Sequence, residues 1–381
     1  MRALACARYL AIIVVAGLVA SVAFVGSGCA PGGWKGLVKL GLVAPFSGYD
    51  QTSAYDVHHA VKMAVAEANA RGGVGGYRVE LVALDDGNDP RTARYQAREL
   101  AVDGKVIGVV GHLSTTALLA GAPEYSKAGL AVLSPAMAPD DLVGAISLNA
   151  GQHELAAAIV EFAYGRVRAT NLVVMYQEGA DFQGVAEKVA RKSEDRGRGV
   201  VLQALSRQDR EFRGAVESLQ GPGAVPLVIF VGDADQGAAL AVKLRAETPG
   251  AGLLFAGDVD SGALGKFGGK AVEGAWYVTS GLDRETPAAK EFAERYHAAG
   301  QRELRPNVAL AYDAANIILA AAARAGGGAA TRMLVRENLA NVWDYHGVTG
   351  SVSFGADGRR LNVYVDTLRL TEAGYPGRRD Y

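Results

Sequence analysis

The stretch VIGVVGHLSTTALLAGAPEYSKAGLAVL, residues 106–133, holds the unit from which we predict the fold. Val106–Gly111 is an apolar run without clean polar alternation, which is typical of a strand buried on both faces. Thr115–Lys127 follows with a helical pattern, and residues 130–133 form the next apolar run. A strand, a helix and a strand in this order form the β-α-β unit of parallel sheets, with its right-handed crossover.

The same alternation extends along the chain on both sides of this unit. We expect further strands at 37–44, 77–84, 172–176, 200–205, 227–231, 253–256 and 275–279. We expect helices at 54–71, 90–102, 154–165, 182–196, 211–219 and 236–247. The C-terminal part is expected to contain helices at 288–299, 308–325 and 331–340, and strands at 348–354 and 361–370. The sequence thus predicts an α/β protein with two doubly wound, mainly parallel sheets.

The length and composition agree with two globular domains. The chain has 381 residues, more than one ordinary hydrophobic core holds. Hydrophobic residues make up 50% and charged residues 21%, which is a soluble globular profile. The formal net charge is −1, so no basic excess exists to neutralise a phosphate backbone. We therefore expect no nucleic acid partner.

The N-terminus has the pattern of a secretory signal. Arg2 and Arg8 give a positive start, residues 9–25 are apolar and uncharged, and the small residues GSG precede Cys29. A cysteine directly after small residues is typical of a bacterial lipoprotein signal. We expect residues 1–28 to be a lipoprotein signal peptide and Cys29 to carry lipid, attaching the protein to a membrane on its extracytoplasmic side.

The alternative for this segment is an uncleaved membrane anchor. The apolar run 9–25 is slightly short for a hydrocarbon core of about 30 Å. The other cysteine, Cys6, lies within the segment to be removed, so the mature chain is expected to have no disulfide.

The motifs that carry catalysis or bind cofactors are missing from the sequence. The glycine-rich stretch at 72–76 follows a helix and precedes a strand, the reverse of a dinucleotide site, so we expect a turn. His58 and His59 are the only paired histidines, and adjacent helical residues point in different directions. We expect no catalytic residue, no metal and no cofactor. Asp85 and Asp86 end a strand, where acids can be catalytic, but we favour a role in a turn and at a lobe interface.

The segment 112–116 can serve one of two purposes. Ser114, Thr115 and Thr116 follow the strand Val106–Gly111 and start a helix. Hydroxyl groups here cap free backbone N–H groups, which is a purely structural role. The same amides and the helix dipole also make an anion site, and the carboxyl end of a parallel strand is where open α/β sheets bind ligands. The local sequence leaves both roles open.

Seven short segments, in order, resemble one family, and the resemblance covers residues 38–370. The chain resembles the periplasmic solute-binding proteins of the branched-chain amino acid ABC transporter type, also called the leucine-binding protein family. The segments that resemble it are VKLGLVAPFSG (38–48), AVAEANARGGVGG (64–76), LDDGNDP (84–90), GHLSTT (111–116), LSPA (133–136), AYDAA (311–315) and the closing GVTG, SF and DG (347–358).

The resemblance implies a type I periplasmic binding protein fold, with two lobes joined by a three-stranded hinge. The chain would cross between lobes near 148–153, 280–285 and 343–347. Lobe one is then expected to hold 36–150 and 283–344, and lobe two to hold 151–282 and 345–381. The lobes would close on a small polar solute by hinge motion, and the closed form would deliver it to an ABC transporter permease.

The resemblance also implies a ligand site. Ser114 and Thr115 would meet a ligand carboxylate, and the carbonyl of Ala136 would meet an α-amino group. Asp258, with Asp260 close by, would supply the acid from lobe two that completes the ammonium site.

Several residues depart from the family pattern at this site. Met137 stands where a threonine is expected, and Asp181 and Phe182 stand at the position of a tyrosine-glycine pair. These departures argue against a standard branched-chain amino acid as the ligand. The acids Asp181, Asp233 and Asp235 would favour an amine or a hydroxyl-rich ligand, or they are helix N-caps.

Two other functions compete with solute binding. On the same fold, the protein would be a ligand sensor or an envelope regulatory protein that docks a protein partner. As a hydrolase or other α/β enzyme it would need a nucleophile elbow, a triad or a metal cluster, and the sequence shows none of these.

Overall fold

The computed structural model describes residues 33–140, 142–209, 211–212, 219, 227–301, 303–328, 331–372 and 374–379. The expected signal peptide, Cys29 and most of the expected helix at 211–219 lie outside the described residues. The chain divides into two units, Met1–Gly36 and Leu37–Tyr381. All that follows concerns the second unit.

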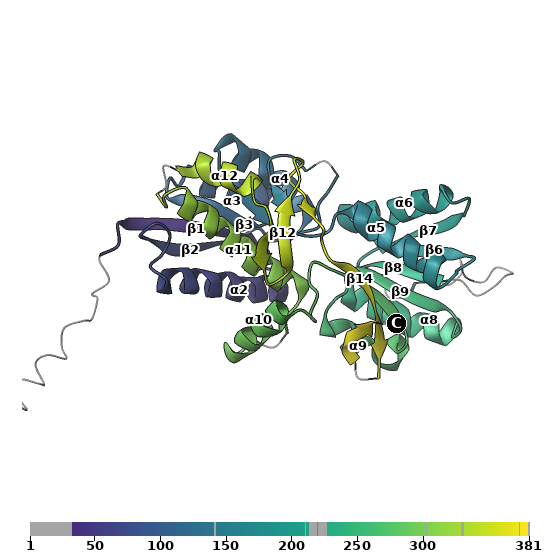
Figure 1. Ribbon diagram of the computed structural model, residues 1–381. Coiled ribbons are helices and arrows are strands. Elements are labelled where there is room, and N and C mark those ends of the chain that lie inside the picture. The colour runs from purple at the N-terminus through teal and green to yellow at the C-terminus, as the bar shows by residue number, and fades with distance from the viewer. Residues whose placement is uncertain are drawn as a thin grey trace, which may run out of the picture. The chain divides into compact units, whose positions relative to one another are not determined.

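The first large sheet has five strands in the order β2-β1-β3-β4-β5. They are β1 (Gly36–Ala44), β2 (Tyr77–Asp85), β3 (Val106–Gly111), β4 (Val132–Ser134) and β5 (Ile146–Ser147). The β1–β3, β3–β4 and β4–β5 pairs are parallel. The helices of this part are α2 (Gln51–Ala70), α3 (Pro90–Val102), α4 (Thr115–Lys127), α10 (Pro287–Ala298), α11 (Pro306–Arg324) and α12 (Arg332–Ala340) (Figure 1). We call this part lobe one.

The second large sheet has seven strands in the order β15-β14-β10-β9-β8-β6-β7. They are β6 (Leu172–Gln177), β7 (Val200–Leu205), β8 (Leu227–Asp233), β9 (Gly252–Asp258), β10 (Trp276–Ser280), β14 (Val365–Thr371) and β15 (Gly374–Arg379). The sheet is parallel except for the β10–β14 and β14–β15 pairs. Its helices are α5 (Gln152–Glu161) with η1 (Phe162–Arg166), α6 (Ala180–Glu194), α8 (Ala234–Glu247), and α9 (Gly262–Gly268) with η2 (Gly269–Val272). We call this part lobe two.

Each large sheet is buried on both faces, which explains why the strands lack polar alternation. Successive residues of a strand point to opposite faces. On β1, Leu42 belongs to the core that α2 and α11 cover, while Val43 belongs to the core that α3 and α4 cover. On β8, Phe230 and Ile229 likewise lie in separate cores. The predicted doubly wound α/β arrangement is confirmed.

Helix α11 is the one described helix that is long and apolar enough to cross a membrane. In its most apolar stretch 72% of the residues are buried, and the helix packs against α2 and β3. Its apolar character is therefore that of a core helix of lobe one.

The third connection between the lobes lies later in the chain than the resemblance implied. The small sheet of β11 (Tyr345–Gly347), β12 (Gly350–Phe354) and β13 (Arg360–Leu361) packs into the core of lobe one (Figure 1). Asp313 of α11 holds it there, accepting hydrogen bonds from the amides of Val348 and Thr349, both 2.9 Å long.

The chain enters lobe two only after β13. Val363 and Val365 pack against a core of lobe two. The expected crossing at 343–347, and with it the start of the second part of lobe two at 345, is therefore wrong. The small sheet closes the core of lobe one, and the crossing falls between β13 and β14.

Candidate functional site

A cavity of about 310 Å³ opens at the carboxyl ends of parallel strands from both large sheets. Open α/β sheets bind their ligands at this edge, because loops there diverge and leave space. Both lobes contribute to the wall. The lining residues are Pro45, Asp50, Ser53, Asn88, Leu113, Ser114, Thr116, Pro135, Ala136, Met137, Asn149, Gln177, Glu178, Gly179, Asp181, Phe182, Arg207, Asp233, Gly257, Asp258 and Asn307.

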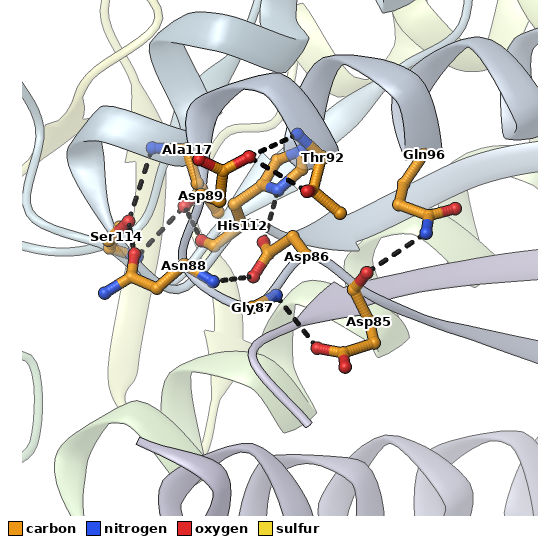
Figure 2. Close-up of polar contacts among 12 residues, drawn as sticks. Asp85, Asp86, Gly87, Asn88, Asp89, Thr92, Gln96, His112, Ser114 and Ala117 are labelled. Atoms are coloured by element: carbon orange, nitrogen blue, oxygen red, sulfur yellow. Dashed lines mark hydrogen bonds and ion pairs between the residues drawn. The ribbon is translucent and has the colours of Figure 1, made fainter. Parts of the chain in front are cut away.

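Ser114 lines the cavity and also caps α4. Its hydroxyl oxygen accepts a hydrogen bond from the amide of Ala117 at 3.3 Å, and its hydroxyl donates to Asn88 (Figure 2). Of the two expected roles for this residue, the N-cap is present, and the side chain lies at the cavity wall as well.

Thr115 bridges the two lobes through its backbone. Its N–H donates to Asp181 Oδ2 at 3.1 Å, and its hydroxyl donates to the carbonyl of Met137 at 2.9 Å. Asp181 comes from the first turn of α6 in lobe two. The Asp181 carboxylate thus already accepts a hydrogen bond from a backbone amide at the N-terminus of α4.

The Asp181 carboxylate has a hydrogen-bond partner for only one of its two oxygens among the described residues. Its second oxygen, Oδ1, is buried and has no hydrogen-bond partner among the described residues. Burial raises the pKa of the Asp181 carboxyl, and the hydrogen bonds from Thr115 oppose this shift. The group therefore favours an additional donor or cation beside Oδ1.

The next loop places Ala136 and Met137 at the cavity. The carbonyl of Ala136 accepts a hydrogen bond from the hydroxyl of Ser147 at 2.8 Å. A carbonyl oxygen has two lone pairs, so it retains one for a ligand donor. The side chains of Met137 and Phe182 pack against a core of lobe two, and both residues line the cavity.

Asp258 and Asp260 have different surroundings although only one residue separates them. Asp258 ends β9 at the cavity, and its carboxylate has no hydrogen bond or ion pair among the described residues. Solvent reaches it through the cavity, yet the surrounding protein raises the pKa of its carboxyl, while Arg305 opposes that shift.

Asp260 is buried and is absent from the cavity wall. Arg284 donates to both of its oxygens, at 2.9 and 3.0 Å, and the Thr279 hydroxyl donates to it as well. Of the two acids that the resemblance suggested, only Asp258 faces the cavity.

A group of polar residues joins the lobes beside the cavity. Arg207 of lobe two forms an ion pair with Asp50 of lobe one at 3.1 Å, and its guanidinium lies 4.0 Å from the ring centre of Tyr49. The Tyr49 hydroxyl donates to Asp235. Asp233 caps α8 through the amide of Gln236, as the N-cap interpretation proposed.

Asp85 and Asp86 shape the loop after β2 (Figure 2). Asp85 accepts from the amides of Ser47 and Gly87. Asp86 accepts from the amide of Asn88, and its other oxygen lies 2.7 Å from His112 Nδ1. Both acids are thus used as turn residues, and they hold Asn88 beside Ser114.

Among the described ranges, no group of three or more His, Cys, Asp or Glu side chains is placed to hold a metal ion. The acids at the cavity come from separate elements, with glycine, aromatic and amide residues between them. Their arrangement presents hydrogen-bond acceptors to a small molecule.

The model of the family described as periplasmic binding protein matches residues 37–374. An amino acid binding protein of Pseudomonas aeruginosa is 25% identical over 303 residues, which cover 77% of this chain and 79% of that protein. Leu/Ile/Val-binding protein homolog 2 of Brucella abortus is 23% identical, over 86% of this chain and 89% of its own.

Solved structures have the same fold. The branched-chain amino acid transporter substrate binding protein LivJ of Streptococcus pneumoniae, solved with isoleucine, has a TM-score of 0.79 at 20% identity, covering 90% of this chain and 99% of its own. The leucine binding protein LivK of Thermotoga maritima also has a TM-score of 0.79, at 22% identity, with coverages of 88% and 96%.

The two-lobed fold with a cavity at the strand ends defines a type I solute-binding protein. The chain belongs to the periplasmic binding protein family, whose model spans nearly all of Leu37–Tyr381. The predicted resemblance to the branched-chain amino acid type is confirmed. This is a family of solute-binding proteins of ABC transporters that work outside the cytoplasm.

Proposed function

We propose that the protein is a lipoprotein that captures one small polar solute in the cavity and delivers it to the permease of an ABC transporter. The observation that carries the proposal is the cavity itself, which both lobes line at the carboxyl ends of their strands. Its volume of about 310 Å³ is at the lower end for ligand sites, which suits a small solute.

The proposed mechanism is closure of the lobes around the solute. Along the described residues the chain crosses between the lobes three times, and polar contacts such as those of Thr115 with Asp181 and of Arg207 with Asp50 bridge them. Exposed ion pairs contribute only about 0–1 kcal/mol each. A solute that touches both walls can therefore decide which arrangement dominates, since a ligand shifts such an equilibrium by its difference in affinity for the two states.

We propose that the ligand contacts are made by residues of both walls. Ser114, Ala136 and Met137 would contribute from lobe one, while Thr115, which is absent from the cavity lining, would position Asp181. Asp181, Phe182 and Asp258 would contribute from lobe two.

A thermal-shift screen tests the proposed function. The protein would be residues 33–381, which include the whole compact unit Leu37–Tyr381. The panel would hold amino acids, amides, amines and small acids. A true ligand at a hundredfold excess over its Kd is expected to stabilise the fold by about 2.7 kcal/mol. If the folded chain shows no stabilisation with any solute in the panel, the proposal is wrong.

Lipid attachment at Cys29 makes a separate prediction. Bacteria that express the full chain and receive a radiolabelled fatty acid should yield labelled protein, because the acylated thiol becomes the anchor. Cys29→Ser should abolish the label and move the protein from the membrane fraction to the soluble extracytoplasmic fraction. Cys6→Ser is the matched control and should keep the label. Equal labelling of the Cys29→Ser protein would rule out this anchor.

A further inference from the structure

We propose that the cavity selects a small organic cation, an amine or a guanidinium compound, that carries no carboxylate at the α4 end. This inference rests on the proposed function and specifies its solute class. It follows from the position of Asp181, from the charge of the cavity wall and from the acceptors that remain without partners.

Asp181 occupies the place where a ligand carboxylate would bind. The Thr115 amide at the N-terminus of α4 donates to Asp181 Oδ2 at 3.1 Å. Two hydroxyl groups of this helix end are also used, since the Thr115 hydroxyl donates to the Met137 carbonyl and the Ser114 hydroxyl donates to Asn88. The N-terminus of a helix carries the equivalent of about half a positive elementary charge, and Asp181 already places a full negative charge beside it. An amino acid that bound through the Thr115 amide would have to displace the Asp181 carboxylate with its own.

The wall of the cavity carries an excess of negative charge. Among the residues that the structure describes, five acids line it, and Arg207 is the one basic residue that does. Arg207 is engaged with Asp50 at 3.1 Å and lies 3.5 Å from Asp233. The remaining three acids, Glu178, Asp181 and Asp258, have no ion pair with any described residue. A cationic ligand would neutralise part of this charge, while an anionic ligand would add to it.

The unpartnered acceptors are those that an ammonium or guanidinium group satisfies. Asp181 Oδ1 is buried without a partner, and the Asp258 carboxylate has none among the described residues. Ammonium and guanidinium groups have only donors, so each N–H can meet one of these oxygens. Charge-assisted hydrogen bonds of this kind are shorter and stronger than neutral ones.

An aromatic side chain lies next to these acids. Phe182 lines the cavity and packs so closely on Gly257 that a β-carbon there would come within 3.0 Å of its ring. Gly257 directly precedes Asp258, so the ring and the carboxylate belong to the same part of the wall. An aromatic face beside a carboxylate is a favourable environment for an organic cation.

The test compares amino acids with the amines made by removing their carboxylate. The pairs are leucine with 3-methylbutylamine, ornithine with 1,4-diaminobutane, and arginine with agmatine. Each member would be titrated calorimetrically into residues 33–381. At least one amine is expected to bind ten times more tightly than its parent. If every parent binds as tightly as its amine or more tightly, the inference is overturned.

Variants at Asp181 identify the cause of the selectivity. Asp181→Asn keeps an acceptor for the Thr115 amide but removes the charge, so amine affinity should fall at least tenfold. Asp181→Ala frees the Thr115 amide, so the affinity for the parent amino acid should rise relative to the affinity for its amine. Asp195→Asn, at an exposed acid that caps the C-terminal end of α6 and lies outside the cavity wall, is the matched control and should keep the wild-type ratio. An unchanged ratio in both Asp181 variants, with unliganded melting temperatures near wild type, would also overturn the inference.

The same experiments separate this inference from the proposed function. If the thermal-shift panel yields a neutral or acidic ligand and no amine, the protein is a solute-binding protein and the cation inference is wrong. If no solute in either set binds, both proposals are wrong.

Discussion

Asp258→Asn should weaken ligand binding about 10- to 100-fold, which corresponds to about 1.4–2.8 kcal/mol. The carboxylate lies at the cavity and has no partner among the described residues, so its charge is free to pair with a ligand nitrogen. Asparagine has nearly the same shape, and therefore the change removes charge without opening a cavity. The effect is expected whether the ligand nitrogen is an α-amino group or the cationic group inferred above. Calorimetric titration of both proteins measures it.

The matched control for this variant is Asp344→Asn. Asp344 is exposed, lies outside the cavity wall and has a positive φ of 51°, a conformation that asparagine tolerates well. This substitution should leave the affinity within about twofold of wild type. Wild-type affinity in Asp258→Asn would show that the Asp258 carboxylate does not bind the ligand nitrogen.

The affinity for a ligand ammonium should also depend on pH through Asp258. The surrounding protein raises the pKa of this carboxyl in the free protein, the acids Asp50, Asp233 and Asp260 add to the shift, and Arg305 opposes it. A bound cation favours the carboxylate and so lowers that pKa, which means that binding releases a proton at low pH. The affinity should be highest above the pKa of the free protein and should fall as the pH drops through it.

Most of the fold could be predicted from the sequence, because the spacing of apolar residues follows the periods of strands and helices. The apolar run of β3, the capped start of α4 and the run before Ser134 each predict their element locally, and the structure has them there. The shortest and most polar strands lack that signal. Strand β15, with the sequence GYPGRR, is held by antiparallel pairing with β14, and its sequence has no apolar pattern that would predict a strand.

Residues whose environment depends on distant partners were harder to predict. The sequence offered Asp258 and Asp260 as near equivalents, and their difference comes from Arg284, which lies 24 residues further along the chain. The bond between Asp181 and the Thr115 amide spans 66 residues. The sequence suggested both Asp181 and Thr115 as site residues. It could not show that the Asp181 carboxylate accepts a hydrogen bond from the Thr115 amide.

The position of Arg207 carried no signal in the sequence. It follows β7 in a polar turn, and its partners Tyr49 and Asp50 lie more than 150 residues earlier. Such contacts depend on how the two lobes meet. Local patterns of charge and hydrophobicity carry no information on this, so the residue was missed.

Arg284→Ala should destabilise the fold by about 3–5 kcal/mol, because it leaves the Asp260 carboxylate buried without its cation. Arg284 lies in the connection from β10 to α10, where the chain passes from lobe two to lobe one. It donates to both oxygens of Asp260 and lies 5.3 Å from the ring centre of Tyr375 in β15. Urea unfolding of residues 33–381 measures the free energy.

Lys290→Ala is the comparison that isolates burial as the cause. Lys290 forms an ion pair with Glu285 at 2.8 Å, but both side chains are exposed. Its loss should change the free energy of unfolding by no more than about 1 kcal/mol. A loss of similar size in both variants would mean that Asp260 gains little from Arg284. Packing against β15 would then hold the segment between β10 and α10 in place. A contact other than this ion pair would have to explain why Asp260 is buried while Asp258 lies at the cavity.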